Sequence, residues 1–234
     1  MSRIIIGKNA VREALNLGIV NKLYLVNDNN EFLELAKKKK IETIITTKEK
    51  LDAMSKGLHQ GVICEADDYK YYQVNDIVND DKNSLIVILD GLKDPHNLGA
   101  VLRTCEATNV DGVIIPKNRS VRLNETVGKV STGAIDLVKV AEVTNLSQTI
   151  DYLKKQGYWI VGAEHEERSE CYWNIDYNMK IALVIGSEGE GISHLVKEKC
   201  DYLVDIPMSG KINSLNASVS TALIIYEIRR KQRK

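Results

Sequence analysis

Residues 85–104 read LIVILDGLKDPHNLGAVLRT and set the architecture of the larger part of the chain. The first five side chains are all apolar, which is typical of a central strand in a parallel sheet that is covered on both faces. A turn rich in Gly, Asp and Pro follows, and Asn97 is placed to cap the helix that comes next. Helical patterns separate four similar apolar runs, at residues 112–115, 159–162, 181–185 and 202–206. This alternation predicts an α/β domain built on a parallel sheet with helices on both faces.

The 234 residues divide into three predicted segments. Residues 1–68 alternate short strands with helical patterns and are expected to form a small α/β domain. Residues 69–83 interleave tyrosines with aspartates and show no sustained period, which indicates a linker. Residues 84–234 contain the predicted parallel sheet and close with a helical pattern over residues 213–230.

The composition is that of an ordinary globular protein, with 44% hydrophobic and 27% charged residues. It excludes a disordered polyelectrolyte, a collagen and a low-complexity chain. The 32 Lys and Arg residues balance 32 Asp and Glu residues. This balance argues against a protein that binds nucleic acid mainly through excess positive charge over its whole surface.

Four cysteines, Cys64, Cys105, Cys171 and Cys200, are scattered without a CxxC spacing. We therefore expect neither a zinc site nor a disulfide framework, and we interpret them as reduced, mostly buried thiols. No apolar run approaches the roughly 20 residues that span a bilayer, and residues 1–8 are too polar for a signal peptide. These features predict a cytoplasmic protein without a metal or a membrane partner.

Ligands of open parallel sheets bind beyond the carboxyl ends of the strands, and three segments there carry polar residues. The first contains Asn97 and Arg103, which on their own could be only a helix cap and a solvated side chain. The second is residues 186–191, GSEGEG, whose GxxGxG order differs from the GxGxxG dinucleotide fingerprint. Its glycines would admit a ligand close to the backbone, and its two acids favour a hydroxyl or cationic ligand. A tight turn that caps the next helix is the alternative.

The third segment is residues 206–220, IPMSGKINSLNASVS. No charged residue occurs between Ile212 and Tyr226, so this stretch is expected to be largely buried. Its first two turns are nevertheless crowded with Asn and Ser side chains, and buried polar groups need partners. We therefore favour a functional role for this polar start over a purely structural one.

Taken in order, the three segments resemble motifs one, two and three of the SpoU (TrmH-type) family of RNA ribose 2′-O-methyltransferases, in the SPOUT superfamily. Asn97 and Arg103 match an N-x5-R pattern, and Glu188 lies in a GxEGxG-type loop. The third motif is similar to Ile206-Pro207-Met208 followed by SLNAS at residues 214–218. IGKNAV at residues 6–11 and HQGV at residues 59–62 resemble the small RNA-binding domain that precedes the enzyme in RlmB-like members.

The resemblance implies a catalytic domain with a deep C-terminal trefoil knot, which periodicity could not predict because chain connections rarely thread loops. It further implies S-adenosyl-L-methionine as cofactor, a homodimer formed through the C-terminal domain, and a guanosine ribose of large-subunit (23S) ribosomal RNA as substrate. The catalytic residues implied by the motifs are Arg103, Asn97, Glu188, Ser214 and Asn216. The cofactor-binding residues implied by position are Gly186, Ile206, Leu215, Thr132 and Gly133.

An arginine guanidinium keeps its proton in proteins, so we prefer a role for Arg103 in binding the adjacent phosphate and stabilising the developing alkoxide. Three alternatives stay open. The substrate could be transfer RNA or another ribosomal position, or the chain could be a catalytically silent RNA-binding protein of ribosome assembly. A dinucleotide-dependent oxidoreductase is disfavoured by the missing fingerprint.

Local basic groups could bind RNA even though the chain is neutral overall. Between Pro116 and Val130 only Glu125 opposes four bases, which are Lys117, Arg119, Arg122 and Lys129. This segment follows a predicted central strand, so it is expected to lie near the site and to bind the RNA backbone. Charge runs are also common on solvated surfaces, and that reading applies equally to residues 37–40 and to the basic tail at 229–234.

Overall fold

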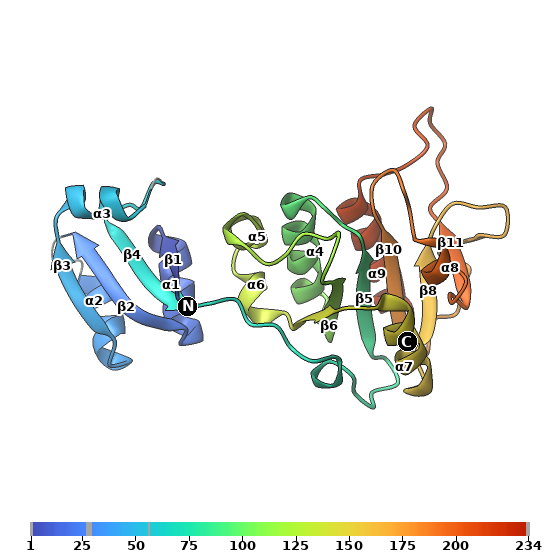
Figure 1. The fold of residues 1–234 in the computed structure, drawn as a ribbon, viewed down its shortest axis with the longest axis horizontal. Coiled ribbons are helices and arrows are strands. Elements are labelled where there is room, and N and C mark those ends of the chain that lie inside the picture. Colours follow the sequence, from blue (N-terminus) through green and yellow to red (C-terminus); the bar gives the residue numbers. More distant parts are fainter. Residues whose placement is uncertain (1, 27–29, 56, 233–234) are drawn as a thin grey trace. The chain divides into compact units, whose positions relative to one another are not determined.

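The computed structural model describes residues 2–26, 30–55 and 57–232. The chain divides into two compact α/β units, Met1–Tyr69 and Lys70–Lys234 (Figure 1). None of the helices in the described part of the chain is long and apolar enough to cross a membrane.

The N-terminal unit is a four-stranded sheet with helices packed on it. The strand order is β1-β4-β2-β3, in which β4 is antiparallel to both neighbours and β2 and β3 are parallel. The strands are β1 (Ser2–Ile6), β2 (Val20–Val26), β3 (Glu42–Thr46) and β4 (Val62–Asp67). The helices are α1 (Lys8–Leu17), α2 (Asn30–Lys38) and α3 (Lys48–Met54). Side chains of α1 and α2 meet alternate residues of β2 and β4 in one apolar core.

The two N-terminal sequence motifs lie against each other. The side-chain oxygen of Gln60 accepts a hydrogen bond from the backbone N–H of Lys8 at 3.1 Å, so the HQG turn caps the first turn of α1. His59 is buried, its Nδ1 accepts from the N–H of Gly61 at 2.9 Å, and its Nε2 contacts Asp52 at 2.9 Å. This turn therefore joins α1, α3 and β4.

The second unit contains the predicted parallel sheet. Its seven strands lie in the order β7-β6-β5-β10-β8-β11-β9, and every neighbouring pair is parallel. The strands are β5 (Leu85–Asp90), β6 (Gly112–Pro116), β7 (Val140–Val143), β8 (Trp159–Ala163), β9 (Glu170–Cys171), β10 (Ile181–Gly186) and β11 (Tyr202–Asp205). The five apolar runs of the sequence are β5, β6, β8, β10 and β11. The short edge strands β7 and β9 were not predicted, because neither has a long apolar run.

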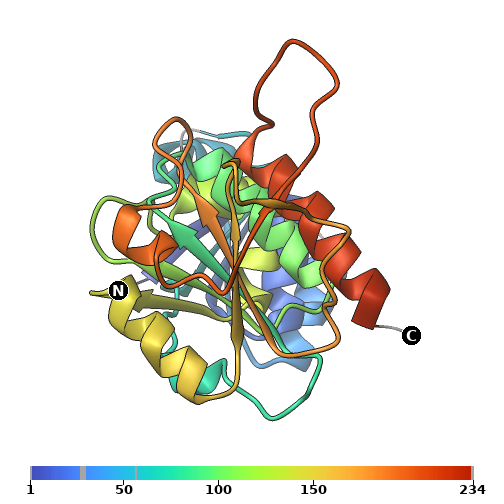
Figure 2. The same ribbon diagram turned by 90° about the vertical axis from the view of Figure 1, so that its right-hand side faces the viewer.

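Helices cover both faces of this sheet, as predicted. They are α4 (Pro95–Ala107), α5 (Glu125–Ser131), α6 (Ala134–Leu137), α7 (Leu146–Lys155), α8 (His194–Lys197) and α9 (Ala217–Gln232), with a short 3-10 turn η1 at Val74–Asp76. Side chains of α7 and α8 share a core with Ile86 and Ile88 of β5. The helix α4 contacts α5, α6 and α9, and Figure 2 shows α9 (red) lying beside α4 (green). The helices α4 and α9 therefore pack together on one face of the sheet.

Residues 69–83, predicted to be a linker, lie in the structure mostly within the second unit. The N–H of Tyr72 donates to the carbonyl of Val140 at 2.8 Å, and the hydroxyl of Tyr71 accepts from the N–H of Leu123 at 2.9 Å. Ile77 is buried in the core beneath β6. This segment is thus bound along the edge of the sheet in the second unit.

The C-terminal helix begins later than predicted, and the polar segment before it is exposed. The pattern predicted a largely buried helix from residue 213, but α9 starts at Ala217 and Ile212 is 71% exposed. The reason is the side chain of Asn216, whose Oδ1 accepts from the N–H and the hydroxyl of Ser218 at 2.9 and 2.6 Å. Asn216 therefore caps the helix and leaves residues 207–216 as an exposed loop.

Two basic side chains of the C-terminal tail form hydrogen bonds within the second unit. Arg229 donates to the carbonyls of Asn83 at 2.8 Å and Thr108 at 2.9 Å, and so ties α9 to the segment before β5 and to the end of α4. Lys231 donates to the carbonyls of Trp173 and Ile175 at 2.5 and 2.6 Å. These two side chains are bound to backbone carbonyls, so Arg229 and Lys231 are less available to RNA than the composition of the tail suggests.

The four cysteines are free thiols in unequal surroundings. Burial raises the pKa of Cys64 and of Cys200 to about 12, and it also raises the pKa of Cys105. At pH 8 a thiol with a pKa near 12 is thiolate in roughly one molecule in ten thousand. We therefore expect iodoacetamide to alkylate Cys171 first in the folded protein, as followed by intact mass and peptide mapping. Labelling of Cys64 at the same rate as Cys171 would contradict these surroundings.

Candidate functional site

A cavity of about 560 Å³ lies at the carboxyl ends of β8, β10 and β11. Its walls are residues 163–165, 185–189, 191, 204–206 and 208, together with 213–217, 220 and 224. The second and third polar segments of the sequence thus face each other across one cavity. This position, beyond the carboxyl edge of a parallel sheet, is where ligands of such sheets bind.

The glycine loop, residues 186–191, closes tightly at its base. Ser187 and Gly191 exchange backbone hydrogen bonds of 3.1 and 3.0 Å. A Cβ placed on Gly186 would lie 2.2 Å from the carbonyl carbon of Gly191 and 2.4 Å from the nitrogen of Ile192. No side chain larger than hydrogen fits there without moving the loop. The loop is therefore a tight turn and, at the same time, a wall that offers its backbone to the cavity.

Three side chains from the three polar segments meet by hydrogen bonds. The Nδ2 of Asn97 donates to Oε1 of Glu188 at 2.8 Å. The Nδ2 of Asn216 donates to Oδ1 of Asn97 at 2.9 Å and to Oε1 of Glu188 at 3.0 Å. Asn97 is buried within α4. The prediction that it caps this helix is wrong, because the helix begins at Pro95 and its cap is Asp94, which accepts from the N–H of His96 at 2.9 Å. The fold thus joins one residue from each predicted motif, although they are far apart in the sequence.

Arg103 is not part of this cluster. It lies six positions after Asn97 on α4, which turns its side chain about 240° around the helix axis from Asn97. It is exposed and has no hydrogen-bond or ion-pair partner within the described chain. The guanidinium is therefore available for a ligand, and no neighbouring side chain holds it in one position.

The other predicted site residues divide into two groups. Ser214, Leu215, Ile206 and Gly186 line the cavity. Thr132 and Gly133 do not; they form the turn between α5 and α6, with left-handed φ values of 48° and 88°. The structure therefore does not bring these two residues to the cavity wall within one chain.

The predicted basic segment lies next to the first polar segment. The N–H of Val121 and the hydroxyl of Ser120 donate to the carbonyl of Leu92 at 2.7 and 3.1 Å. The position of a Cβ on Gly91 would be 3.7 Å from both the carbonyl of Arg119 and the Cβ of Ser187. The loop that carries Arg119 thus adjoins both the turn after β5 and the glycine loop.

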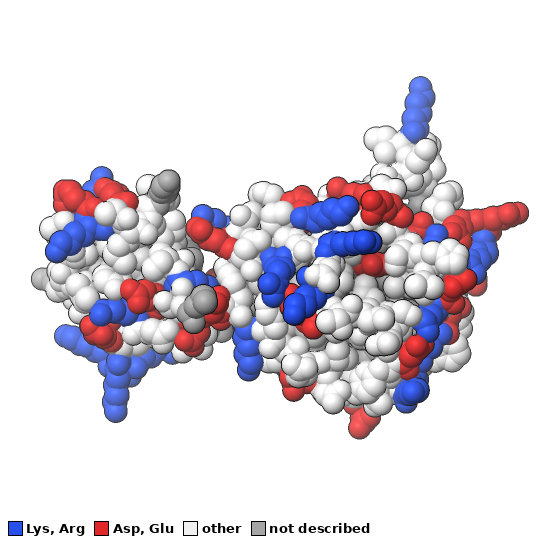
Figure 3. All heavy atoms as spheres, in the orientation of Figure 1, with Lys and Arg blue, Asp and Glu red and all other residues white. Residues whose placement is uncertain are grey.

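Only part of the predicted basic set is free to bind an anion. Arg122 forms a two-pronged ion pair with Glu142 at 2.7 and 3.1 Å, and Lys129 pairs with Glu125 at 2.6 Å. The side chains of Lys117 and Arg119 have no such partner in the part of the chain that the structure describes. Figure 3 shows Lys and Arg side chains gathered on one face of the second unit, over the region of α4 and β5.

The cavity wall itself is acidic. Glu164, Glu188 and Asp205 line it, and its described lining residues include neither Lys nor Arg. A pyrophosphate would be repelled by these carboxylates, whereas a cation would be stabilised. Glu164 and Asp205 were not predicted as site residues, because they lie outside the three motifs and nothing in the local sequence marks them.

Comparison with known proteins identifies the family of this chain. The chain matches the SpoU rRNA Methylase family over residues 84–226, and a family described as RNA 2′-O ribose methyltransferase substrate binding over residues 4–72. A protein of Staphylococcus saprophyticus that is assigned to the TrmH family of tRNA/rRNA methyltransferases is 49% identical over 240 residues, which cover 98% of this chain and 96% of that protein.

Solved structures show the same fold at lower identity. The SpoU methyltransferase AviRb from Streptomyces viridochromogenes, in complex with AdoMet, matches with a TM-score of 0.85 at 22% identity, covering 99% of this chain and 91% of that one. AdoMet-bound rRNA methyltransferase from Sinorhizobium meliloti matches with a TM-score of 0.84 at 23% identity, covering 98% and 87%. The predicted α/β architecture with a small N-terminal domain is confirmed. Its sequence and fold place the chain in the SpoU family of TrmH-type RNA methyltransferases.

Proposed function

We propose that this protein transfers the methyl group of S-adenosyl-L-methionine to the 2′-oxygen of a guanosine ribose in 23S ribosomal RNA. We propose that it does so in the cytoplasm. The observation that carries the proposal is the cluster of Asn97, Glu188 and Asn216. Each comes from a different polar segment, and two of them, Glu188 and Asn216, line an acidic cavity with a glycine wall. A silent RNA-binding protein would have no need for this arrangement.

The cavity suits the proposed cofactor. Gly186, Ile206 and Leu215 would hold it largely through backbone groups, because the base of the glycine loop leaves no room for a side chain. The carboxylates of the wall favour its sulfonium charge. When bound, S-adenosylmethionine supplies an activated methyl group, so that positioning of the ribose can provide much of the rate. Thr132 and Gly133 lie in the turn between α5 and α6 and do not line the cavity, so this proposal gives them no contact with the cofactor within the single chain.

Arg103 and the asparagine–glutamate cluster have separate tasks in this proposal. Glu188 and the two asparagines hold the ribose, and Ser214 orients these groups from the cavity wall. The Arg103 guanidinium binds the neighbouring phosphate and stabilises the negative charge that develops on the 2′-oxygen. The guanidinium has no partner among the described residues, which supports this role, since a paired guanidinium would first have to break its contacts.

We further propose a homodimer that forms through the C-terminal domain, and the C-terminal trefoil knot that the family resemblance implies. The exposed apolar residues of α9 support the dimer: Val219 is 46%, Leu223 is 40% and Tyr226 is 57% exposed in the single chain. A groove beside Leu223 and Tyr226 continues this surface. Contiguous apolar surface of this kind is typical of an interface.

Transfer RNA is the second candidate substrate, because the Staphylococcus saprophyticus relative is described as acting on tRNA or rRNA. Mapping 2′-O-methyl groups in ribosomal and transfer RNA, with and without this gene, separates the two. Loss of one guanosine mark in 23S RNA supports the first proposal, and loss of a tRNA mark supports the second. Calorimetry separates both from the silent module: no binding at millimolar S-adenosylmethionine would favour that module.

Lys117 and Arg119 are expected to bind RNA phosphates. The double substitution Lys117→Ala, Arg119→Ala should weaken RNA binding and lower the slope of log affinity against log salt by about 2. Lys155→Ala, a substitution of an exposed base in the last turn of α7, is the matched control and should change neither. Filter binding at several salt concentrations measures both quantities. An unchanged salt slope in the double variant would remove this loop from the RNA interface.

A further inference from the structure

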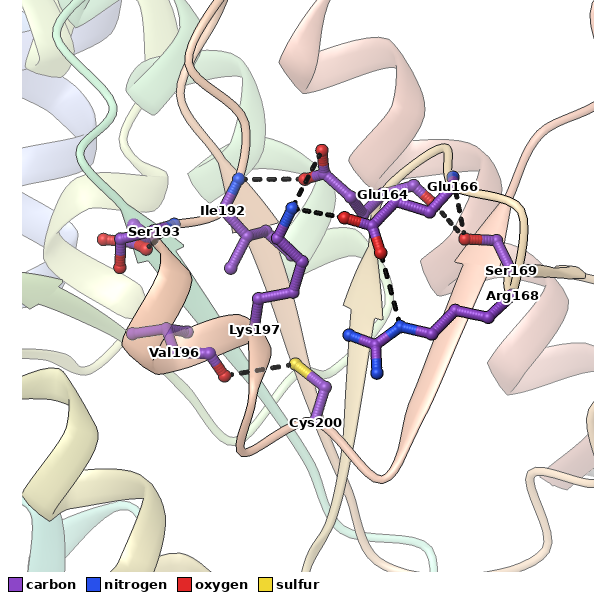
Figure 4. A network of polar contacts seen from close by, with 10 residues as sticks. Glu164, Glu166, Arg168, Ser169, Ile192, Ser193, Val196, Lys197 and Cys200 are labelled. Carbon is purple, nitrogen blue, oxygen red and sulfur yellow. Dashed lines mark hydrogen bonds and ion pairs between the residues drawn. The ribbon is translucent and has the colours of Figure 1, made fainter.

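Glu164 reaches the glycine loop from the strand beside it. The residue directly follows β8, which lies next to β10, the strand from which the loop emerges. Its side chain is 19% exposed and lines the cavity. Oε2 accepts a hydrogen bond from the backbone N–H of Ile192 at 2.9 Å, just after the loop ends (Figure 4).

A second carboxylate holds the next backbone group from the other side. Asp90 ends β5, the neighbour of β10 opposite to β8, and its Oδ2 accepts from the N–H of Ser193 at 2.8 Å. Two consecutive N–H groups after the loop are therefore bound by carboxylates from the two strands that flank β10. This carboxylate clamp, Glu164 with Asp90, fixes where the loop ends.

The clamp fits closely against the loop. A Cβ on Gly191 would lie 2.7 Å from both carboxylate oxygens of Glu164, so this glycine lets the carboxylate rest on the backbone. Gly191 also has a φ of 66°, a conformation that favours glycine. The base of the loop is thus held between Gly186 on one side and Glu164 on the other.

Lys197 balances the negative charge at this point. Its Nζ lies 3.8 Å from Oε1 of Glu164 and 2.5 Å from Oε1 of Glu166, as Figure 4 shows. The hydrogen bond with Glu166 raises the pKa of Lys197 and lowers the pKa of Glu166. Arg168 contacts the other oxygen of Glu166 at 3.3 Å. Glu166 therefore shares the cation of Glu164, but it lines no part of the cavity.

We propose that Glu164 and Asp90 are positioning residues that hold the glycine loop in the shape required to bind S-adenosylmethionine. The proposal rests on the proposed function, because it concerns the cavity assigned there to the cofactor. Glu164 acts through the length of its side chain, which extends from the end of β8 to the N–H of Ile192. The neutral amide of glutamine has the same reach and an acceptor oxygen, whereas aspartate keeps the charge and is one methylene shorter.

Three variants and one control test this in the full-length protein by calorimetry with S-adenosylmethionine. Glu164→Ala and Glu164→Asp should each raise the dissociation constant of the cofactor about tenfold or more. Glu164→Gln should stay within about threefold of wild type, because Lys197 already balances the charge of Glu164 and the carboxylates of Glu188 and Asp205 remain in the wall. Glu166→Gln is the control. It removes the other carboxylate that pairs with Lys197, and Glu166 does not line the cavity, so this variant should bind as wild type does.

The ranking of the variants by their affinity for S-adenosylmethionine decides the test, even if Glu164→Ala fails to fold. Weak binding by the aspartate variant with retained binding by the glutamine variant supports the clamp. Equal binding by all variants, or loss by glutamine with retention by aspartate, overturns it. Steady-state methyl transfer should show the same order in KM for S-adenosylmethionine. Absence of binding by wild type would contradict the proposed function instead.

Discussion

Arg103→Ala is expected to lower kcat for methyl transfer by about 10²–10³-fold, while S-adenosylmethionine binding changes less than about twofold. The magnitude is that of removing one preorganised group that stabilises charge in a transition state. Cofactor affinity should persist because Arg103 does not line the cavity. Single-turnover methyl transfer at saturating RNA, together with calorimetry of the cofactor, measures the two effects separately.

The surroundings of Arg103 make this loss easy to interpret. The side chain is exposed and bonds to no other group in the described residues, so its removal should change the free energy of unfolding by less than about 0.5 kcal/mol. Arg103→Lys is the matched variant: it keeps the charge but loses the planar fork that binds phosphate in two places. It should recover only part of the activity. Near-normal transfer by Arg103→Ala at saturating RNA would show that the arginine has another role.

Gly186→Ala is expected to abolish measurable cofactor binding. The added Cβ would lie 2.2 Å from the carbonyl carbon of Gly191, which is backbone and cannot rotate away as a side chain could. The base of the loop must therefore open, and the cavity wall moves with it. Calorimetry should detect no binding at concentrations that saturate the wild-type protein, although circular dichroism should show that the sheet remains folded.

Two other glycines provide controls for this substitution. A Cβ on Gly210 would meet nothing within 4 Å, so Gly210→Ala should bind the cofactor as wild type does. Gly189 lies in the same loop and also has open space, but its φ of 85° makes alanine strained there by about 1 kcal/mol. Gly189→Ala should weaken binding only modestly. Tight binding by Gly186→Ala would mean that the loop base is not the cofactor wall.

The parallel sheet was predictable because its central strands are apolar on both faces. Every residue from Leu85 to Leu89 is buried, and so is every residue from Ile181 to Ile185. The cavity was predictable from the polar residues that follow such strands, since parallel strands present their carboxyl ends at one edge. Local sequence carries both signals, and the family resemblance added the chemistry.

What the sequence could not predict depends on contacts between distant segments. Glu164 contacts the glycine loop only because β8 lies beside β10, and strand order is not written in any local pattern. The late start of α9 depends on Asn216, whose side chain caps the helix while it also contacts Glu188. The pairing of Arg122 with Glu142 likewise follows from the adjacency of β6 and β7. These residues acquire their roles from tertiary structure.

The neutral overall charge conceals a division of charge in the second unit. Carboxylates line the cavity, whereas Lys117 and Arg119, which form no ion pair within the described ranges, lie on the adjoining loop. A cationic cofactor and an anionic RNA would each meet a surface of opposite sign. Net charge therefore gave no indication of the two ligands, although the local distribution fits both.

One measurement tests the central claim most directly. The protein is incubated with S-adenosylmethionine labelled in its methyl group and with 23S ribosomal RNA that lacks modifications, and the RNA is then digested to nucleosides. We predict that the label appears in 2′-O-methylguanosine and that its initial rate of incorporation falls by about 10²-fold or more when the Arg103→Ala protein is used. Label on a nucleobase would contradict ribose methylation of this RNA. So would unlabelled RNA after incubation with protein that binds the cofactor.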